Sequence, residues 1–382
     1  MVGAPVIGLV AGEASGDLLG AHLVAALKAR RPDLQFSGIA GPRMIAAGVT
    51  VLYPMEKLAV RGYVEVLKHY LEIISIRRRL KQHFLAQPPA VFIGIDAPDF
   101  NLDLELALKQ AGIRTIHYVS PSIWAWRGER IHKIKQAVDR VLTLFPFEND
   151  LYNKAGIPVS YVGHPLADML HAYPPQADIR ARLDMPLEGF VVALLPGSRV
   201  SELQNMADLF VATARRIAAA MPGVKFVAPL VNADTRVLFQ NAVTRAGGME
   251  LLVLDGHSHD AIVAADVVLV ASGTATLETA LLQRPMVITY RMPRVSWWMM
   301  NPRRYQPYVG LPNILAGEFV VPEFLQDAAT PENLAQAVLD LLQNAPRREA
   351  IRRRFASMTA DLRQNTSQKA ADAVMPYLEN RV

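Results

Sequence analysis

The chain has 382 residues, of which 51% are hydrophobic and 20% charged, and it contains no cysteine. This balance favours a globular protein of two domains, and the lack of cysteine excludes disulfides, thiolate metal sites and a cysteine nucleophile. With 40 basic and 35 acidic residues the net charge is +5. This mild bias is no nucleic-acid signature, and it fits nucleic acid, an anionic membrane surface or a phosphorylated substrate.

Short β-branched runs alternate with helical patterns through the first part of the chain. The expected strands are VIGLVAGE, QFSGIAG, AVFIGIDAP, RTIHYVS, DRVLTLFPFE and PVSYVGH. Each run is nearly continuous in apolar residues, which is typical of parallel strands that helices cover on both faces. We therefore predict a first α/β domain over residues 1–168.

Clustered prolines after His164 predict a linker, and the alternation then restarts. FVVALLPGSR, KFVAPLVN, ELLVLDG, DVVLVASG and PMVITYR predict a second α/β domain over residues 186–345. Residues 346–382 are expected to be helical, and the sequence leaves open whether they return to the first domain. The predicted fold is α/β, with two Rossmann-like doubly wound domains facing a central cleft at the carboxyl ends of their strands.

Polar residues follow two expected strands of the first domain. VAGEASGDLLG holds Glu13, Ser15 and Asp17, a set that suits sugar hydroxyls better than phosphate, although a plain tight turn would also explain it. In VFIGIDAPDF, Asp96 ends a strand, where a carboxylate can act as a general base. The alternative is that Asp96 caps the helix that Pro98 begins.

Two strand-to-helix turns of the second domain suit an anion, because free N–H groups and the helix dipole meet there. Glu278 lies one turn inside the second helix, where it could accept hydrogen bonds from a ribose. Two such turns in one domain indicate a nucleoside diphosphate, whereas either turn alone also fits ordinary capping, with Glu278 complementing the dipole. The residues of the two turns are Gly197, Ser198, Arg199, Ser272, Gly273 and Thr274.

Metal chemistry has little support in the sequence. No D-x-D pair occurs, and no histidine pair combines with carboxylates at helical spacing, so we expect no metal site. His257 and His259 in DGHSHD are predicted to be loop residues. Arg199 and helix dipoles would then neutralise a departing diphosphate.

Two segments carry more apolar surface than a soluble helix needs. Residues 64–80 present Val66, Tyr70 and Ile73 as a second apolar stripe, and SWWMMNPRRYQPY combines Trp297 and Trp298 with arginines. A membrane surface or an acyl-chain groove fits both segments. A helix buried between other elements and a packed inter-domain loop are the alternatives.

Several motifs together resemble those of the lipid-A-disaccharide synthases: AGEASGD, IDAPDF, HYVSPSIWAWR, LFPFE, LPGSR, PLVNA, ASGTATLE, YRM and LPNILAG, spread from residue 11 to residue 317. The resemblance implies an inverting glycosyltransferase of GT-B architecture. Such an enzyme joins UDP-2,3-diacylglucosamine to 2,3-diacylglucosamine 1-phosphate, releases UDP and forms the β-1,6-linked disaccharide. It also implies no cofactor, no nucleic-acid partner and a peripheral place on the cytoplasmic face of the inner membrane, and it allows a homo-oligomer.

The resemblance also implies residue roles. Asp96 would take the proton from the 6-hydroxyl of the acceptor, and Glu13, Ser15 and Asp17 would line the acceptor side. Arg199 and Glu278 would hold UDP together with two further residues, which are Asn232 of PLVNA and Asn313 of LPN.

Two other interpretations stay open at this point. One is another UDP-sugar enzyme of the same architecture, such as the peptidoglycan N-acetylglucosaminyltransferase or a UDP-N-acetylglucosamine 2-epimerase, and an epimerase would need no lipid surface. The other is a basic module without catalysis that binds nucleic acid or membrane. The second predicts a steep salt dependence of binding, and the sequence offers no basic stripe to support it.

Overall fold

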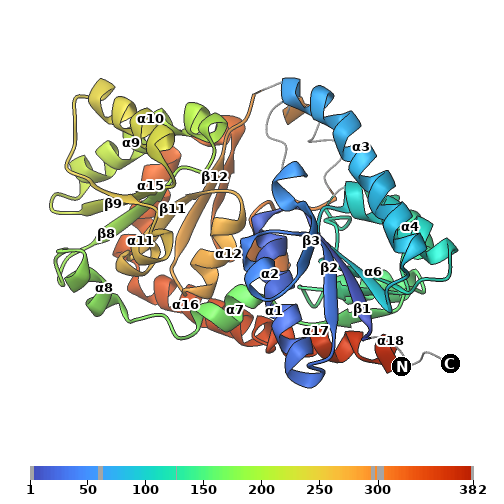
Figure 1. Ribbon diagram of the computed structural model, residues 1–382. Helices are drawn as coiled ribbons and strands as arrows, with labels where there is room; N and C mark the ends of the chain where they lie inside the picture. Colours follow the sequence, from blue (N-terminus) through green and yellow to red (C-terminus); the bar gives the residue numbers. More distant parts are fainter. Residues whose placement is uncertain (1–3, 59–62, 126, 294–296, 299–304, 380–382) are drawn as a thin grey trace. The chain divides into compact units, whose positions relative to one another are not determined.

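The computed structural model describes residues 4–58, 63–125, 127–293, 297–298 and 305–379. The chain divides into two units (Figure 1). The first unit comprises Met1–Asp168 together with Leu362–Val382, and the second comprises Met169–Asp361. The C-terminal segment therefore belongs to the first unit, so that this unit is built from both ends of the sequence.

In the described part of the first unit, seven parallel strands form one sheet in the order β3-β2-β1-β4-β5-β6-β7. The strands are β1 Val6–Ala11, β2 Gln35–Ala40, β3 Thr50–Pro54, β4 Val91–Ile95, β5 Thr115–Tyr118, β6 Arg140–Thr143 and β7 Val159–Tyr161. The helices are α1 Ala14–Arg30, α2 Pro42–Ala46, α3 Tyr63–Ala86, α4 Pro98–Gln110, α5 Arg130–Ala137, α6 Glu148–Lys154, α17 Thr366–Val374 and α18 Pro376–Glu379, with α7 Pro165–Leu170 at the boundary.

The described part of the second unit repeats this plan with six parallel strands in the order β10-β9-β8-β11-β12-β13. The strands are β8 Val191–Leu195, β9 Lys225–Leu230, β10 Leu252–Asp255, β11 Val267–Ala271, β12 Met286–Tyr290 and β13 Glu323–Leu325. The helices are α8 Gln176–Arg182, α9 Val200–Ala220, α10 Ala233–Arg245, α11 Ser258–Ala264, α12 Thr274–Leu281, α14 Leu311–Ala316, α15 Pro331–Gln343 and α16 Ala345–Leu362.

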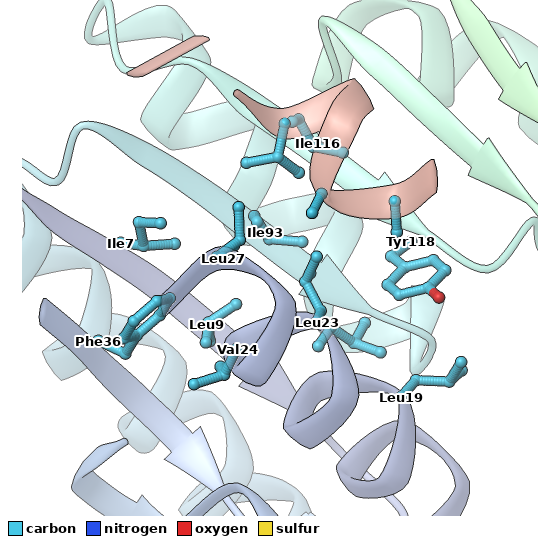
Figure 2. Close-up of a cluster of buried hydrophobic side chains, with 14 of the residues drawn as sticks. Ile7, Leu9, Leu19, Leu23, Val24, Leu27, Phe36, Ile93, Ile116 and Tyr118 are labelled. Carbon is cyan, nitrogen blue, oxygen red and sulfur yellow. The ribbon is translucent and has the colours of Figure 1, made fainter. Parts of the chain in front are cut away.

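Alternation along the strands gives the first sheet two apolar faces. Ile7 and Leu9 of β1 point into one buried cluster, whereas Val10 belongs to another with α3 and α4. Figure 2 shows Leu23 and Leu27 of α1 lying over the first of these faces. Four residues of α17 and α18 complete that cluster: Ala370, Ala371, Val374 and Leu378. The returning C-terminal helices are therefore part of the core of the first unit.

Two of the strands were not predicted from the sequence. β3 and β13 lie at the edges of their sheets, and every residue of both is at least partly exposed. An edge strand is covered less than a central one, and TVLYP and EFL are short segments of this kind.

Candidate active site

The first sheet has one position where the strand order reverses, between the neighbouring strands β1 and β4. Open α/β sheets bind ligands at the carboxyl ends of the strands at such a switch point. The turn holding Glu13 and Ser15 follows β1, and Asp96 follows β4. The two turns pack tightly, since a Cβ placed on Gly12 would lie 2.7 Å from the Cβ of Ala97.

The backbone at Asp96 is strained. Asp96 and Ala97 have φ angles of 54° and 42°, in the left-handed region that non-glycine residues rarely adopt. The Asp96 N–H donates to the Tyr118 carbonyl at 2.8 Å, and the Asp96 carbonyl accepts from Asn101 Nδ2 at 2.8 Å. Ala97 is the N-cap of α4 and no side chain caps that end, so the capping role considered for Asp96 is wrong. Strain held this firmly is typical of functional positions.

The three residues of the first turn differ in exposure. Glu13 is the N-cap residue of α1 and is exposed, as is Ser15 in the first turn of that helix. Asp17 is buried, and its carboxylate accepts hydrogen bonds from the backbone N–H groups of Gly41, Arg43 and Met44 at 2.9–3.0 Å. Asp17 therefore caps the start of α2, and its predicted contact with an acceptor is wrong.

The second sheet reverses its order between β8 and β11, and both predicted anion turns follow these two strands. At the end of β8, however, Glu202 occupies the turn. Its Oε2 accepts from the N–H groups of Ser198 at 2.9 Å and Arg199 at 3.2 Å, and its Oε1 lies 3.3 Å from Arg199 Nη1. Gly197 makes room for it, since a Cβ there would lie 2.7 Å from the Glu202 Cβ. A carboxylate of the chain thus holds the position expected for phosphate.

The turn after β11 is open. Gly273 is the N-cap residue of α12 with φ 159° and ψ −163°, and no side chain caps this helix. A Cβ on Gly273 would meet no atom within 4 Å, and Thr274 is exposed. Ser272 is held by a hydrogen bond from its N–H to the Thr289 carbonyl at 2.9 Å. Of the two predicted anion turns, this is the one with a free approach.

Glu278 lies on the second turn of α12 and is four-fifths buried. Its Oε2 is 2.9 Å from Nε2 of His259, and the His259 ring contacts the Tyr173 ring edge-on at 5.8 Å. His259 is in helix α11, so its assignment to a loop is wrong, whereas His257 is the residue that precedes that helix. The sequence did not indicate the pairing of His259 with Glu278.

Two further nucleotide-site predictions fall on residues with structural roles. Asn313 is fully buried: Nδ2 donates to the Val321 carbonyl and Glu323 Oε1, both at 2.8 Å, and Oδ1 accepts from the Val321 N–H at 3.1 Å. Asn313 therefore fixes the backbone at Val321 and the Glu323 carboxylate, and its contact with UDP stays a prediction. Asn232 caps α10 through Oδ1, which accepts from the Thr235 N–H at 3.0 Å, and it is exposed.

A buried carboxyl group near the carboxyl ends of β5 and β6 was missed by sequence reasoning. Glu148 is 2% exposed and accepts from Trp124 Nε1 and from the Phe145 N–H, each at 3.1 Å. Burial raises the pKa of Glu148 to about 7. Phe147 packs edge-on against Trp124 at 5.3 Å, so the motifs SPSIWAWR and LFPFE form one packed cluster.

The residues predicted to contact lipid differ in their exposure to solvent. Tyr70 of α3 is 58% exposed, whereas Ile73 packs against the buried residues Ile76 and Leu80. Ile73 therefore lies on the packed side of α3, and the proposed second stripe is not a continuous exposed face. The Val66 side chain lies outside the described residues. Trp298 is 77% exposed and Trp297 is half-buried.

Within the ranges that the structure describes, no group of three His, Cys, Asp or Glu side chains could hold a metal ion. In the same ranges, no helix has the length and apolar character needed to cross a membrane.

Residues 7–375 match the sequence model of a family described as lipid-A-disaccharide synthetase. The chain belongs to this family. The lipid-A-disaccharide synthase of Methylobacillus flagellatus is 55% identical, over 98% of this chain and 100% of its own length. That of Dechloromonas aromatica is also 55% identical, over 97% of this chain and 98% of its own length. The resemblance drawn from the sequence motifs is confirmed.

Solved structures share the fold at low identity. A glycotransferase of kitacinnamycin is 16% identical with a TM-score of 0.64, over 98% of this chain and 99% of that one. The UDP-GlcNAc 2-epimerase from Neisseria meningitidis, bound to UDP-GlcNAc, is 12% identical with a TM-score of 0.63, over 98% and 99%. The prediction of a GT-B fold with two doubly wound α/β domains is confirmed for this member of the lipid-A-disaccharide synthetase family.

Proposed function

We propose that the protein transfers the diacylglucosamine unit of UDP-2,3-diacylglucosamine to 2,3-diacylglucosamine 1-phosphate, giving UDP and the β-1,6-linked lipid A disaccharide. Family membership supports the reaction. The observation that carries the residue assignment is the strained turn at the switch point of the first sheet, which holds Asp96 at the carboxyl end of β4.

The acceptor reacts through its 6-hydroxyl. Asp96 takes the proton from this hydroxyl while the oxygen attacks the anomeric carbon of the donor from the face opposite the diphosphate. The bond from the anomeric carbon to the diphosphate oxygen breaks, UDP departs with the electron pair, and the configuration inverts through an oxocarbenium-like transition state. Glu13 and Ser15, exposed beside the Asp96 turn, are the groups that we assign to the acceptor hydroxyls.

The donor binds through the second unit. The open N-terminus of α12, with Ser272, Gly273 and Thr274, offers N–H and hydroxyl groups to the diphosphate. Arg199, whose side chain is 78% exposed, adds a cation that stabilises the charge on departing UDP. Glu278 retains one carboxylate oxygen for the ribose hydroxyls, because His259 contacts the other.

The acylated substrates reside in a membrane, and α3 offers a surface that suits one. Tyr70 and the neighbouring Leu71, 58% and 72% exposed, lie on the same helix as the exposed Arg78 and Arg79. Apolar side chains with nearby cations bind the interface of an anionic bilayer. We therefore place the protein peripherally on the cytoplasmic face of the inner membrane.

The test is transfer of radiolabelled sugar between the two purified diacylglucosamine substrates, with EDTA present. A labelled disaccharide is expected, and Asp96→Asn serves as the control that should form none. If no disaccharide forms while UDP still raises the melting temperature, the nucleotide assignment stands and the acceptor assignment is wrong. Conversion of UDP-N-acetylglucosamine to its 2-epimer under the same conditions would favour the epimerase alternative.

A further inference from the structure

A buried pair of ionisable side chains lies behind the Asp96 turn. His117 of β5 and Glu105 of α4 are both fully buried, and His117 Nδ1 is 2.8 Å from Glu105 Oε1. Burying a lone ionised group is costly, and the pair reduces this cost because each side chain offers the other a hydrogen bond and an opposite charge. Such a pair is retained at some expense to stability, which favours a role beyond packing.

Space for the pair depends on Gly94, the strand residue that lies beside His117 in the sheet. A Cβ on Gly94 would lie 2.2 Å from Glu105 Oε1 and 2.9 Å from the Asn101 Cβ. Asn101 and Glu105 stand four residues apart on α4 and therefore share one face of that helix. Glycine in strand β4, two residues before Asp96, therefore leaves the space that this polar cluster occupies.

Asn101, on the same helix face as Glu105, contacts the turn, because its Nδ2 donates to the Asp96 carbonyl at 2.8 Å. Among the residues that the structure describes, three buried atoms of the cluster find no hydrogen-bond partner: Asn101 Oδ1, Glu105 Oε2 and His117 Nε2. Native structures leave few buried polar atoms unpaired, and those that occur gather at functional sites. Their concentration directly behind the strained turn links the cluster to Asp96.

Charge also connects the pair to Asp96. Burial opposes ionisation of His117, but the charge of Glu105, their hydrogen bond and the charge of Asp96 together raise the His117 pKa. Burial raises the pKa of Glu105.

The other charged groups near the pair lie on the outer side of α4. Asp103 pairs with Arg77 of α3 and Lys133 of α5, and Asp99 pairs with Arg130 of α5. Asp103 and Asp99 are 41% and 82% exposed, so water screens them. Beyond the carboxyl end of β4, Asp96 is the group whose charge acts on His117 together with that of Glu105.

We propose that Glu105 and His117 are positioning residues for the transfer reaction, which fix α4 against the sheet and so hold the Asp96 turn in place. The proposal rests on the role of Asp96 as the base. During the reaction the acceptor proton moves to the Asp96 carboxylate, and the proton shared by Glu105 and His117 stays with the pair.

The experiment measures kcat against pH for Glu105→Gln and His117→Asn, each of which preserves a hydrogen bond across the pair and removes one ionisable group. In both variants kcat should fall by roughly three- to tenfold across the pH range, because the Asp96 turn is held less firmly. The KM for the UDP-sugar should stay within about twofold, because the nucleotide residues lie in the second unit. The double variant, Glu105→Gln with His117→Asn, lacks both ionisable groups. It therefore tests the proposal even where a single variant misfolds because one buried charge is left without its partner.

Tyr152→Phe is the matched structural control, since it removes a buried 2.7 Å hydrogen bond to Ser120 in the same unit without contacting the Asp96 turn. It should lower the melting temperature and leave the pH profile unchanged. Pair variants that behave like Tyr152→Phe would overturn the proposal. Asp96→Asn is measured in parallel: if it retains turnover, the base assignment itself fails, whatever the pair variants do.

Discussion

His259 on α11 and Glu278 on α12 contact each other through Nε2 and Oε2 at 2.9 Å. The contact joins two helices that follow different strands of the second sheet. It fixes the orientation of the Glu278 carboxylate, which would otherwise rotate about its terminal torsion. A carboxylate held in this way is better prepared to bind a ligand than one that only complements a helix dipole.

Glu278→Ala should weaken UDP binding by about 1–3 kcal/mol, the cost of leaving polar ligand groups unpaired. His259→Ala should weaken it less, and the double variant should lose less than the sum of the two, because the residues act together. Titration calorimetry of UDP measures all three. Unchanged UDP affinity in Glu278→Ala would mean that Glu278 only complements the helix dipole.

Asp96→Asn should abolish turnover, since the amide cannot accept the acceptor proton, while UDP affinity stays near that of the unaltered protein. The readouts are disaccharide formation and UDP calorimetry on the same preparation. Asp99→Asn, three residues away in the first turn of α4 and 82% exposed, is a matched control that should retain most activity. Retained turnover in Asp96→Asn would remove Asp96 from the role of base.

Glu202→Gln should tighten UDP binding several-fold. The carboxylate occupies the N–H groups of Ser198 and Arg199, and its charge repels a diphosphate at the neighbouring turn by roughly 1 kcal/mol. Glu250→Gln removes the same charge from an exposed pair with Lys225, at the beginning of β9, and should change nothing. Weaker UDP binding in Glu202→Gln would mean that the carboxylate orders the loop for the ligand.

Replacing Tyr70 and Leu71 by serine should reduce binding to vesicles that contain anionic lipid, with little loss of stability, because both side chains are exposed. Ile76→Ser on the same helix serves as the contrast, since it opens the buried cluster and should lower the melting temperature instead. Sedimentation with vesicles separates the two effects. Undiminished sedimentation of the first variant would remove α3 from the membrane contact.

Glu148 makes stability depend on pH, because its folded pKa of about 7 exceeds the ordinary value of 4.5. Between these values the folded protein binds more protons than the unfolded chain, so the free energy of unfolding should fall as the pH rises from 4.5 to 7, by up to about 3 kcal/mol. Glu148→Gln should flatten this decline. Denaturant unfolding at several pH values measures it, and an equal slope in both proteins would contradict the assignment.

The central strands could be predicted from the sequence because helices cover both of their faces, which requires long apolar runs. The switch-point turns could be predicted as well, since they follow such strands directly. What the sequence could not supply is where each polar side chain points within a turn. Asp17 meets α2 and Asn313 meets Val321 and Glu323, and these partners become neighbours only in the folded chain.

Glu202 is another side chain whose partner the sequence did not reveal. The pattern PGSR predicts an anion site, and a carboxylate three residues after Arg199 accepts hydrogen bonds from this turn within the chain. The pairing of His259 with Glu278 and that of Glu148 with Trp124 were not predicted, because the partners lie 19 and 24 residues apart in the sequence.

The return of α17 and α18 to the first unit has a consequence for biosynthesis. A ribosome makes residues 1–168, then all of residues 169–361, and only then the helices that cover α1. The second unit can therefore finish folding while the first still exposes the apolar face of its sheet. Nascent chains halted before residue 362 should hold a protease-resistant second unit and a first unit that is readily cleaved and depends on chaperones.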